Sequence, residues 1–177
     1  MSDLSDFDRQ PTLIGPTVSL KPLQPEDFEA LFTVASDPLI WEQHPDSSRR
    51  ERAGFEKWFA AALSSGGAFT IRDLVSGNVI GSSRYYDWDP EKREIAIGYT
   101  FLARSHWGGV TNREMKRLML DHAFQSGLKV WFHIWKDNLR SRRAVEKIGA
   151  ILSHTGHKEV AGVPHDYTFY FITGNPG

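Results

Sequence analysis

The stretch of residues 94–150 constrains the fold most strongly, because it reads as a strand, a glycine turn, a helix, a strand and a second helix. Residues 94–102 (EIAIGYTFL) have the β-branched and aromatic content of a mostly buried strand. Gly108 and Gly109 interrupt this pattern, and from Asn112 apolar residues recur with the spacing of one helical face. A strand over 129–135 and a helix over 139–148 follow. The pattern therefore predicts a strand that leads through glycines directly into a helix.

The junction between this strand and the helix is a candidate anion site. The first turn of a helix leaves backbone N–H groups unpaired and carries partial positive charge. Glycines at positions 108 and 109 allow a phosphate to approach the backbone closely. The alternative is that the two glycines only make a tight strand-to-helix turn.

The rest of the chain supplies further strands and two more helices. Apolar faces predict a helix that begins near Pro25 and another over 50–63, and alternating or β-rich segments predict strands over 18–23, 68–72, 78–86, 151–159 and 167–172. The strands at 68–72, 78–86 and 94–102 form an antiparallel meander. The predicted fold class is α/β (α+β), with a mixed, mostly antiparallel central sheet flanked by helices.

The chain length and the positions of proline and glycine near the N-terminus indicate the domain organisation. The 177 residues suffice for one domain with a core and are too few for two comfortable ones. Residues 1–16 are polar and contain Pro11, Gly15 and Pro16, so we expect a flexible N-terminal arm. Residues 17–177 are expected to form the single domain.

Composition excludes several classes of function. The net charge of −1 gives no overall basic field for nucleic acid, and the absence of cysteine excludes disulfides, thiolate metal sites and cysteine nucleophiles. No His, Asp and Glu set has zinc spacing, so no metal is predicted. The N-terminus lacks the layout of a signal peptide, and no run approaches 18 apolar residues. We expect a cytoplasmic protein with neither a nucleic-acid nor a membrane partner.

Two separated motifs, in this order and context, carry a family resemblance: residues 107–116 (WGGVTNREMK) and residues 138–150 (NLRSRRAVEKIGA). Together they resemble the GNAT superfamily of N-acetyltransferases, and within it the Rim-like branch, which includes enzymes that acetylate ribosomal-protein N-termini. The similarity runs over about residues 18–171. It implies a sheet that splays between the strands beginning at Glu94 and Lys129. It also implies acetyl-CoA as acyl donor and an amine as acceptor.

The resemblance also implies how the cofactor is held. The pyrophosphate would lie against backbone N–H groups of residues 107–112, and the backbone of residues 99–102 would bond the pantetheine arm and hold the thioester carbonyl. Asn138 and Ser141 match positions on the pantetheine side. The implied cofactor-binding residues are Tyr99, Thr100, Phe101, Leu102, Trp107, Gly108, Gly109, Val110, Thr111, Asn112, Asn138, Ser141 and Arg142.

One departure from the family pattern concerns Val110, which stands where a glycine is common. A Cβ at this position would restrict the approach of the backbone to a phosphate. The alternative function is therefore a degenerate GNAT domain that serves as a CoA-binding or interaction module without catalysis.

Acetyl transfer needs a neutral amine and a proton for the departing thiolate. A free α-amine titrates near ~7.8 and a lysine near ~10.4, so an α-amine needs less help from a base. Glu94 is the predicted base, with a solvent-facing strand end as the alternative, and Ser141 is the predicted proton donor, with capping or packing as the alternative. Because no cysteine can carry the acetyl group, we expect direct attack of the amine without an acetyl-enzyme.

Basic residues and histidines are ambiguous. His133 is either structural or catalytic, His106 touches either cofactor or solvent, and His122 is expected in the core. A basic group near the two motifs either meets CoA phosphates or forms a solvated face: Arg113, Lys116, Arg140, Arg142 and Arg143.

The acceptor is the least defined partner. Aromatic residues either line a substrate cleft opposite the cofactor or belong to the core: Trp41, Tyr85, Tyr86 and Trp88. The predicted function is transfer of acetyl from acetyl-CoA to a primary amine, either a peptide or protein N-terminal α-amine or a small-molecule amine. A homodimer is one option that the sequence leaves open.

Overall fold

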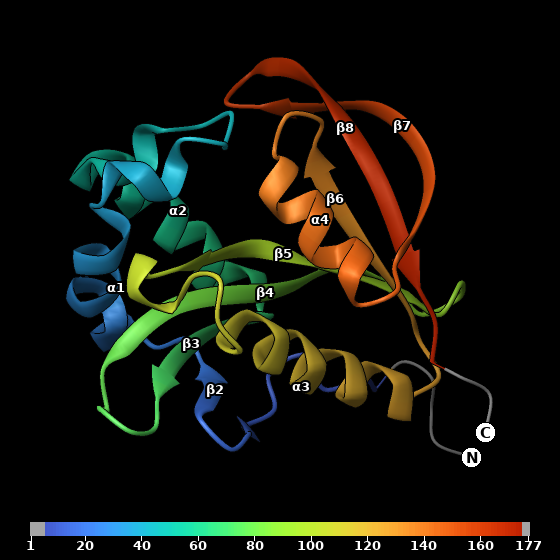
Figure 1. Cartoon of the computed structure of the whole chain (residues 1–177), viewed down its shortest axis with the longest axis horizontal. Coiled ribbons are helices and arrows are strands. Elements are labelled where there is room, and N and C mark those ends of the chain that lie inside the picture. Colours follow the sequence, from blue (N-terminus) through green and yellow to red (C-terminus); the bar gives the residue numbers. More distant parts are fainter. Residues whose placement is uncertain (1–5, 175–177) are drawn as a thin grey trace.

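A computed structural model describes residues 6–174 and contains one eight-stranded sheet with strand order β1-β2-β3-β4-β5-β6-β8-β7 (Figure 1). Among the described strands, only β5 and β6 run parallel. The predicted mixed, mostly antiparallel α/β fold is confirmed. The strands are β1 Leu13–Ile14, β2 Val18–Pro22, β3 Ala68–Asp73, β4 Val79–Asp89, β5 Glu94–Leu102, β6 Lys129–Trp135, β7 Ile151–Val160 and β8 Val163–Ile172.

Helices cover both faces of this sheet. Helix α2 packs on one face, near α1, and α3 and α4 lie on the opposite face (Figure 1). None of the helices within residues 6–174 has the length and apolar character needed to cross a membrane. The helices are α1 Phe28–Ala35, α2 Arg52–Ser65, α3 Thr111–Gln125 and α4 Leu139–Lys147, with 3₁₀ turns at Pro25–Asp27, Pro38–Trp41, Ser48–Arg50 and Arg104–His106.

A β-bulge in β5 decides which side chains face which helices. Ile95 and Ile97 pack in the core cluster that contains α3, whereas Phe101 packs in the cluster that contains α2. Regular alternation would place these three odd-numbered residues on one face. The bulge inserts one extra residue, Tyr99, whose φ of 52° lies in the left-handed region. Thr100 consequently returns to the α3 side, where its hydroxyl lies 2.9 Å from that of Ser83.

Strands β5 and β6 separate after a short paired segment. They pair at Glu94 with Lys129, Ile95 with Val130, and Ala96 with Trp131, and no further along β5. Figure 1 shows the two strands diverging from this point, with α4 beside the opening. The expected splayed strand pair is therefore present, and it exposes one edge of β5 to whatever enters the gap.

The first described residues of the chain pack against the sheet. Residues 1–5 lie outside the described residues, and the division into an arm and a domain stays a prediction. Within residues 6–16, however, Phe7 packs edge-on against Tyr85 with ring centroids 5.4 Å apart, and the Gln10 side chain donates to the Ala68 carbonyl at 2.9 Å. These contacts hold the segment against the sheet.

The last hairpin is longer than predicted because its turn is tighter. Ala161 and Gly162 both have positive φ, 51° and 78°, as a two-residue type I′ turn requires. Strand β8 therefore starts at Val163 and includes Pro164, whereas the sequence pattern predicts a start at residue 167. Pro164 pairs with Glu159 beyond the stretch of β8 that pairs with β6, so its missing N–H breaks no bond on that side.

Candidate functional site

A cavity of about 730 Å³ lies between the end of β5, the start of α3 and the start of α4. It lies on the face of the sheet covered by α3 and α4, beside the part of β5 that no longer pairs with β6. The sequence-predicted residues that the structure brings together on its wall are Thr100, Phe101, Leu102, Trp107, Gly108, Gly109, Asn112 and Ser141. Ile40 and Gln43, from the loop after α1, also line it and had no signal in the sequence.

The cavity wall is strongly cationic. Asp137 is the one carboxylate among the described residues that line it. The N-termini of α3 and α4 both open onto it, and each adds partial positive charge from unpaired backbone N–H groups. This arrangement suits a polyanionic ligand. The lysines and arginines of the wall are Arg113, Lys116, Arg140, Arg143 and Lys147.

Lys116 is the buried cation of this group. It is 8% exposed, and its Nζ donates to Asn112 Oδ1 at 2.8 Å. Burial lowers the pKa of Lys116 to about 8. An anion beside the start of α3 would restore a partner for its charge, because opposite charges favour the ionised form.

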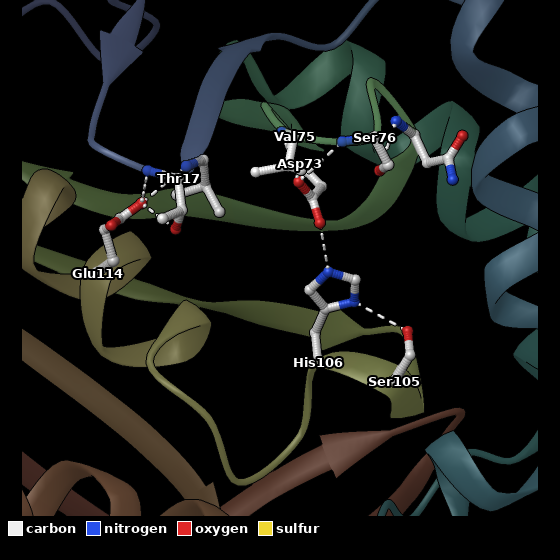
Figure 2. Close-up of polar contacts among 9 residues, drawn as sticks. Thr17, Asp73, Val75, Ser76, Ser105, His106 and Glu114 are labelled. Carbon is white, nitrogen blue, oxygen red and sulfur yellow. Dashed lines mark hydrogen bonds and ion pairs between the residues drawn. The ribbon is translucent and has the colours of Figure 1, made fainter.

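The loop that leads into α3 is pinned through His106 (Figure 2). His106 Nε2 lies 2.9 Å from Asp73 Oδ2, and the Ser105 hydroxyl lies 2.9 Å from His106 Nδ1. Asp73 also accepts the backbone N–H of Val75 at 2.7 Å, and hydrogen bonding, chiefly from His106, lowers the pKa of the carboxyl. His106 thus joins the β3–β4 turn to the cavity wall and is not simply solvent-facing.

Trp107 holds the next part of the loop. Its indole N–H donates to the Leu102 carbonyl at 2.9 Å, and the Arg140 guanidinium carbon lies 3.8 Å from the ring centroid. The Arg140 backbone N–H reaches Gln43 Oε1 at 3.3 Å. These contacts connect the end of β5, the start of α4 and the loop after α1.

Glu114 fixes the start of α3 against β2 (Figure 2). Its Oε2 accepts three hydrogen bonds: from the Thr17 backbone at 3.0 Å, the Thr17 hydroxyl at 2.9 Å and the Val18 backbone at 2.7 Å. An acidic residue in the first turn also complements the helix dipole. The backbone N–H groups at this helix start are therefore preorganised.

The glycine loop adopts a conformation in which only one position needs glycine. Gly108 has φ 70°, whereas Val110, the N-cap of α3, has φ −79°. The Val110 side chain is 64% exposed and is not among the residues that line the cavity. A Cβ at position 110 therefore fits the backbone without occupying the cavity.

Four other predicted cofactor residues lie off the cavity wall. Thr111 is buried at the helix start. Asn138 caps α4, with Oδ1 accepting from the Ser141 backbone at 3.2 Å. Arg142 is held on the sheet side, where it donates to the Tyr170 hydroxyl at 3.2 Å and the Lys136 carbonyl at 3.0 Å. Tyr99 is the bulge residue, and its ring is on the α2 side of β5.

Glu94, the predicted base, is not brought to the cavity. It begins β5 and lines a second depression of about 300 Å³, where it lies 3.6 Å from Lys129 Nζ. Thr100 lies six positions further along β5, which corresponds to roughly 20 Å. The structure thus separates Glu94 from Ser141, and the two catalytic assignments remain predictions.

The predicted acceptor residues do not form one cleft. Trp41 is 4% exposed and donates its indole N–H to Ala35 O at 2.7 Å. Tyr85 is 1% exposed, and its hydroxyl bonds the Met119 carbonyl; Trp88 packs on Phe7. These three residues follow the alternative that the sequence left open, packing in or against the core.

Of the four predicted acceptor residues, only Tyr86 lies near the bulge. Its ring centroid is 5.0 Å from that of Tyr99 and 5.4 Å from that of His133. Burial lowers the pKa of His133 to about 4, and Lys158 Nζ lies 3.0 Å from His133 Nδ1. His122, expected in the core, is half-buried and bonds the Asp8 carbonyl at 2.8 Å.

Two arginines on the α2 side of the bulge were missed. Arg84 is 6% exposed, with its guanidinium carbon 3.9 Å from the Tyr99 ring centroid, and the guanidinium carbon of Arg49 is 6.0 Å from the same centroid. The available signal was an arginine within a strand that otherwise reads as central. No cluster of three or more His, Asp or Glu side chains suited to a metal ion occurs within the part of the chain that the structure describes.

Solved structures share this fold. A GCN5-related N-acetyltransferase from Brucella melitensis has a TM-score of 0.82 and 23% identity, over 93% of this chain and 79% of that chain. RimJ from Mycobacterium smegmatis, solved with CoA-disulfide, gives 0.74 and 20% over 94% and 90%. The spermidine N-acetyltransferase of Vibrio cholerae, solved with CoA and spermine, gives 0.70 and 16% over 90% and 96%. At these identities the likeness shows the fold.

The family follows from the sequence itself. No curated protein sequence matches the chain. Residues 17–151, which include β5, the glycine loop and α4, match the model of the acetyltransferase (GNAT) domain. This match spans most of the chain and both motifs of the site. The chain therefore belongs to the GNAT acetyltransferase family, whose members transfer an acetyl group from acetyl-CoA to an amine.

Proposed function

We propose that this protein transfers the acetyl group of acetyl-CoA directly to a primary amine in a ternary complex, without an acetyl-enzyme. The observation that carries the proposal is the cationic cavity, which ends at the bulge of β5. CoA brings several phosphate charges, and the lining lysines, arginines and helix N-termini complement them. The absence of cysteine supports direct transfer over a covalent intermediate.

The cofactor would bind with its pyrophosphate over residues 108–112 and its pantetheine arm along residues 100–102. Beyond Ala96, β6 no longer pairs with β5, so this edge of the strand can bond the amides of the arm as an added strand would. The thioester carbonyl would then lie at the bulge beside Tyr99. Holding the thioester and the amine in this geometry supplies much of the rate, because it replaces a bimolecular encounter.

Ser141 is the proposed donor of a proton to the departing thiolate. It lines the cavity in the first turn of α4, and no hydrogen bond of its hydroxyl group occurs among the described residues. Glu94 could take part only through intervening water, because it lines the other depression. An α-amine acceptor, which titrates near ~7.8, is partly neutral at physiological pH and needs no strong base.

The acceptor class is proposed from the Rim-like branch: a peptide or protein N-terminal α-amine, or a small amine. The likenesses to RimJ and to a spermidine acetyltransferase support both classes. Purified protein with acetyl-CoA should be screened against N-terminal peptides, amino acids and polyamines while free thiol is followed. Reaction of small amines alone would contradict the peptide assignment and leave acetyl transfer standing.

Calorimetry with acetyl-CoA and with dephospho-CoA tests the cofactor site. We expect binding of acetyl-CoA and weaker binding of dephospho-CoA, since one phosphate contact to a cationic group is lost. No binding of either would favour a degenerate domain. Val110, the sequence hint for that alternative, is exposed and off the cavity wall, so it gives the alternative no support. Ping-pong kinetics would contradict direct transfer.

A further inference from the structure

We propose that the amine acceptor carries a carboxylate close to its amino group and that Arg84 binds this carboxylate. The inference rests on the proposed acetyl transfer. It begins with the alternation of β4, where Ser83 and Tyr85 contact Thr100 and Met119, on the α3 side of the sheet. Arg84 therefore points to the opposite side, where its guanidinium carbon lies 5.6 Å from the Trp58 ring centroid of α2.

Arg84 is a buried charge without a protein partner. The residue is 6% exposed, and its Nε and Nη2 are fully enclosed without any hydrogen bond. No carboxylate among residues 6–174 forms an ion pair with it. A buried guanidinium cannot escape its charge by losing a proton, and buried charges in folded proteins are paired or bind a ligand.

The aromatic neighbours of Arg84 do not satisfy it. Tyr99 lies 3.9 Å from the guanidinium carbon, measured to the ring centroid, and Trp58 lies 5.6 Å from it. Such contacts stabilise a cation through the face of a ring. The N–H donors of a guanidinium lie in its plane and form a fork that matches a carboxylate. Ring contacts therefore leave Arg84 able to bind a carboxylate through two parallel hydrogen bonds.

A second cation increases the local positive potential. The Arg49 side chain is 12% exposed, lies 3.6 Å from Asp46 and approaches the Tyr99 ring to 6.0 Å. Burial, with a further contribution from Arg49, lowers the pKa of Arg84 to about 10, so Arg84 remains charged at neutral pH. Two cations around one ring favour the entry of an anion.

The position of Arg84 relates the anion to the reaction. Arg84 pairs across the sheet with Gly98, the residue before the bulge, while Thr100, just after it, lines the cofactor cavity. A carboxylate on Arg84 would hold the acceptor beside the bulge, where the thioester carbonyl is proposed to lie. The ring of Tyr99 covers the guanidinium, and the residue as a whole is 40% exposed, so Tyr99 would stack against the acceptor or move to admit it.

This geometry selects amines in which the carboxylate is a few bonds from the nitrogen. α-Amino acids meet the condition through their own carboxylate, and peptides meet it when their first residue is Asp or Glu. The shared chemistry is an amine with a nearby carboxylate, and polyamines lack it. An acceptor that was only cationic would face Arg84 and Arg49 with like charge.

Pairs of acceptors that differ in one carboxylate test the inference, and each rate is referred to the concentration of neutral amine, because a nearby carboxylate raises the pKa of the amine. We would measure kcat/KM by thiol release for glycine against glycinamide, and for Asp-Ala-amide against Asn-Ala-amide. The free acid should be favoured at least tenfold in one pair or both, and the pair that shows it identifies the source of the carboxylate. Arg84→Met, which keeps the apolar stem, should bring the two members of that pair to equal rates.

The control variant is Arg117→Met, because Arg117 is 81% exposed on α3 and pairs with Asp121. It should retain the full preference. Thermal unfolding of each variant checks folding, and the comparison within wild-type protein needs no variant. Equal rates for acids and amides in wild type, or an undiminished preference in Arg84→Met, would overturn the inference while acetyl transfer stands.

A result in which no amine reacts would refute the proposed function and still test Arg84. N-acetylglycine and N-acetylglycinamide would then be compared as ligands by thermal shift. The inference expects the acid alone to stabilise wild-type protein, and expects no such effect on Arg84→Met. Equal stabilisation by acid and amide, or by the acid in both proteins, would overturn it.

Discussion

The two sides of β5 at the Tyr99 bulge carry positive charge in different ways. On the cavity side, most of the cations are exposed on α3 and α4, as Arg113 and Arg143 are. On the α2 side, Arg84 is buried with two nitrogens unbonded. Exposed charges act in sum, are screened by salt and contribute little individually. The cavity side therefore suits affinity for a polyanion, whereas the α2 side suits discrimination between acceptors.

The largest effect is expected at Ser141, which lines the cavity in the first turn of α4. Ser141→Ala should lower turnover by about ten- to a thousandfold if the hydroxyl protonates the thiolate. The affinity for acetyl-CoA should change little, because the hydroxyl would act only as charge develops on sulfur. Single-turnover kinetics and calorimetry measure the two quantities separately.

Ser153→Ala, on the exposed strand β7, is the matched control for this change and should remain fully active. Full activity of Ser141→Ala would remove the proposed acid. The proton for the thiolate would then have to come from another group or from water.

The cavity side could be predicted from sequence because its signals are local. Gly108 and Gly109 end one periodicity and Asn112 begins another, so the strand, the loop and the helix start are fixed within residues 94–125. The family motifs add the splay of the two strands. What the local pattern missed on this side, Ile40 and Gln43, comes from a loop distant in sequence.

The α2 side could not be predicted because it depends on a change of register. Tyr99 adopts a positive φ that its residue type rarely takes, and the bulge reverses the facing of every later residue in β5. Without the bulge, the contact of Tyr99 with Arg84 cannot be inferred. The aromatic residues Tyr85 and Trp88 drew attention as cleft residues, yet their contacts are core packing.

Lys116 differs from the other cations on the cavity side because it is buried. Its pKa, lowered by burial to about 8, places its loss of charge in an accessible range. The charged form binds an anion, so the affinity for acetyl-CoA should fall as pH rises through 8 in the wild type. Lys116→Met should weaken binding about tenfold at pH 7, as loss of one charge-assisted hydrogen bond does, and abolish this pH dependence.

Calorimetric titrations at pH 7 and pH 9 give the dependence directly. Lys147→Met is the control, because Lys147 lines the same cavity but is exposed. It should cost less affinity and leave the pH dependence in place. If the pH dependence survives in Lys116→Met, another group causes it. The exposed cations alone would then account for anion binding on the cavity side.

The smallest effects are expected in the glycine loop, because its exposed positions have room for an added side-chain atom. Gly108 has φ 70°, so Gly108→Ala should cost roughly 1 kcal/mol of stability through the left-handed backbone, although no atom lies within 4 Å of an added Cβ. Gly109→Ala, which meets equally open space without that φ, is the matched control and should cost almost nothing. Urea unfolding measures both.

The substitution Val110→Gly tests the alternative of a degenerate domain. The Val110 side chain is exposed and its φ of −79° suits any residue, so its removal should leave the affinity for acetyl-CoA within about twofold. Calorimetry under the conditions used for wild type gives the answer. A gain of tenfold or more would mean that the Cβ of Val110 obstructs the phosphate despite its exposure. That result would support the degenerate alternative.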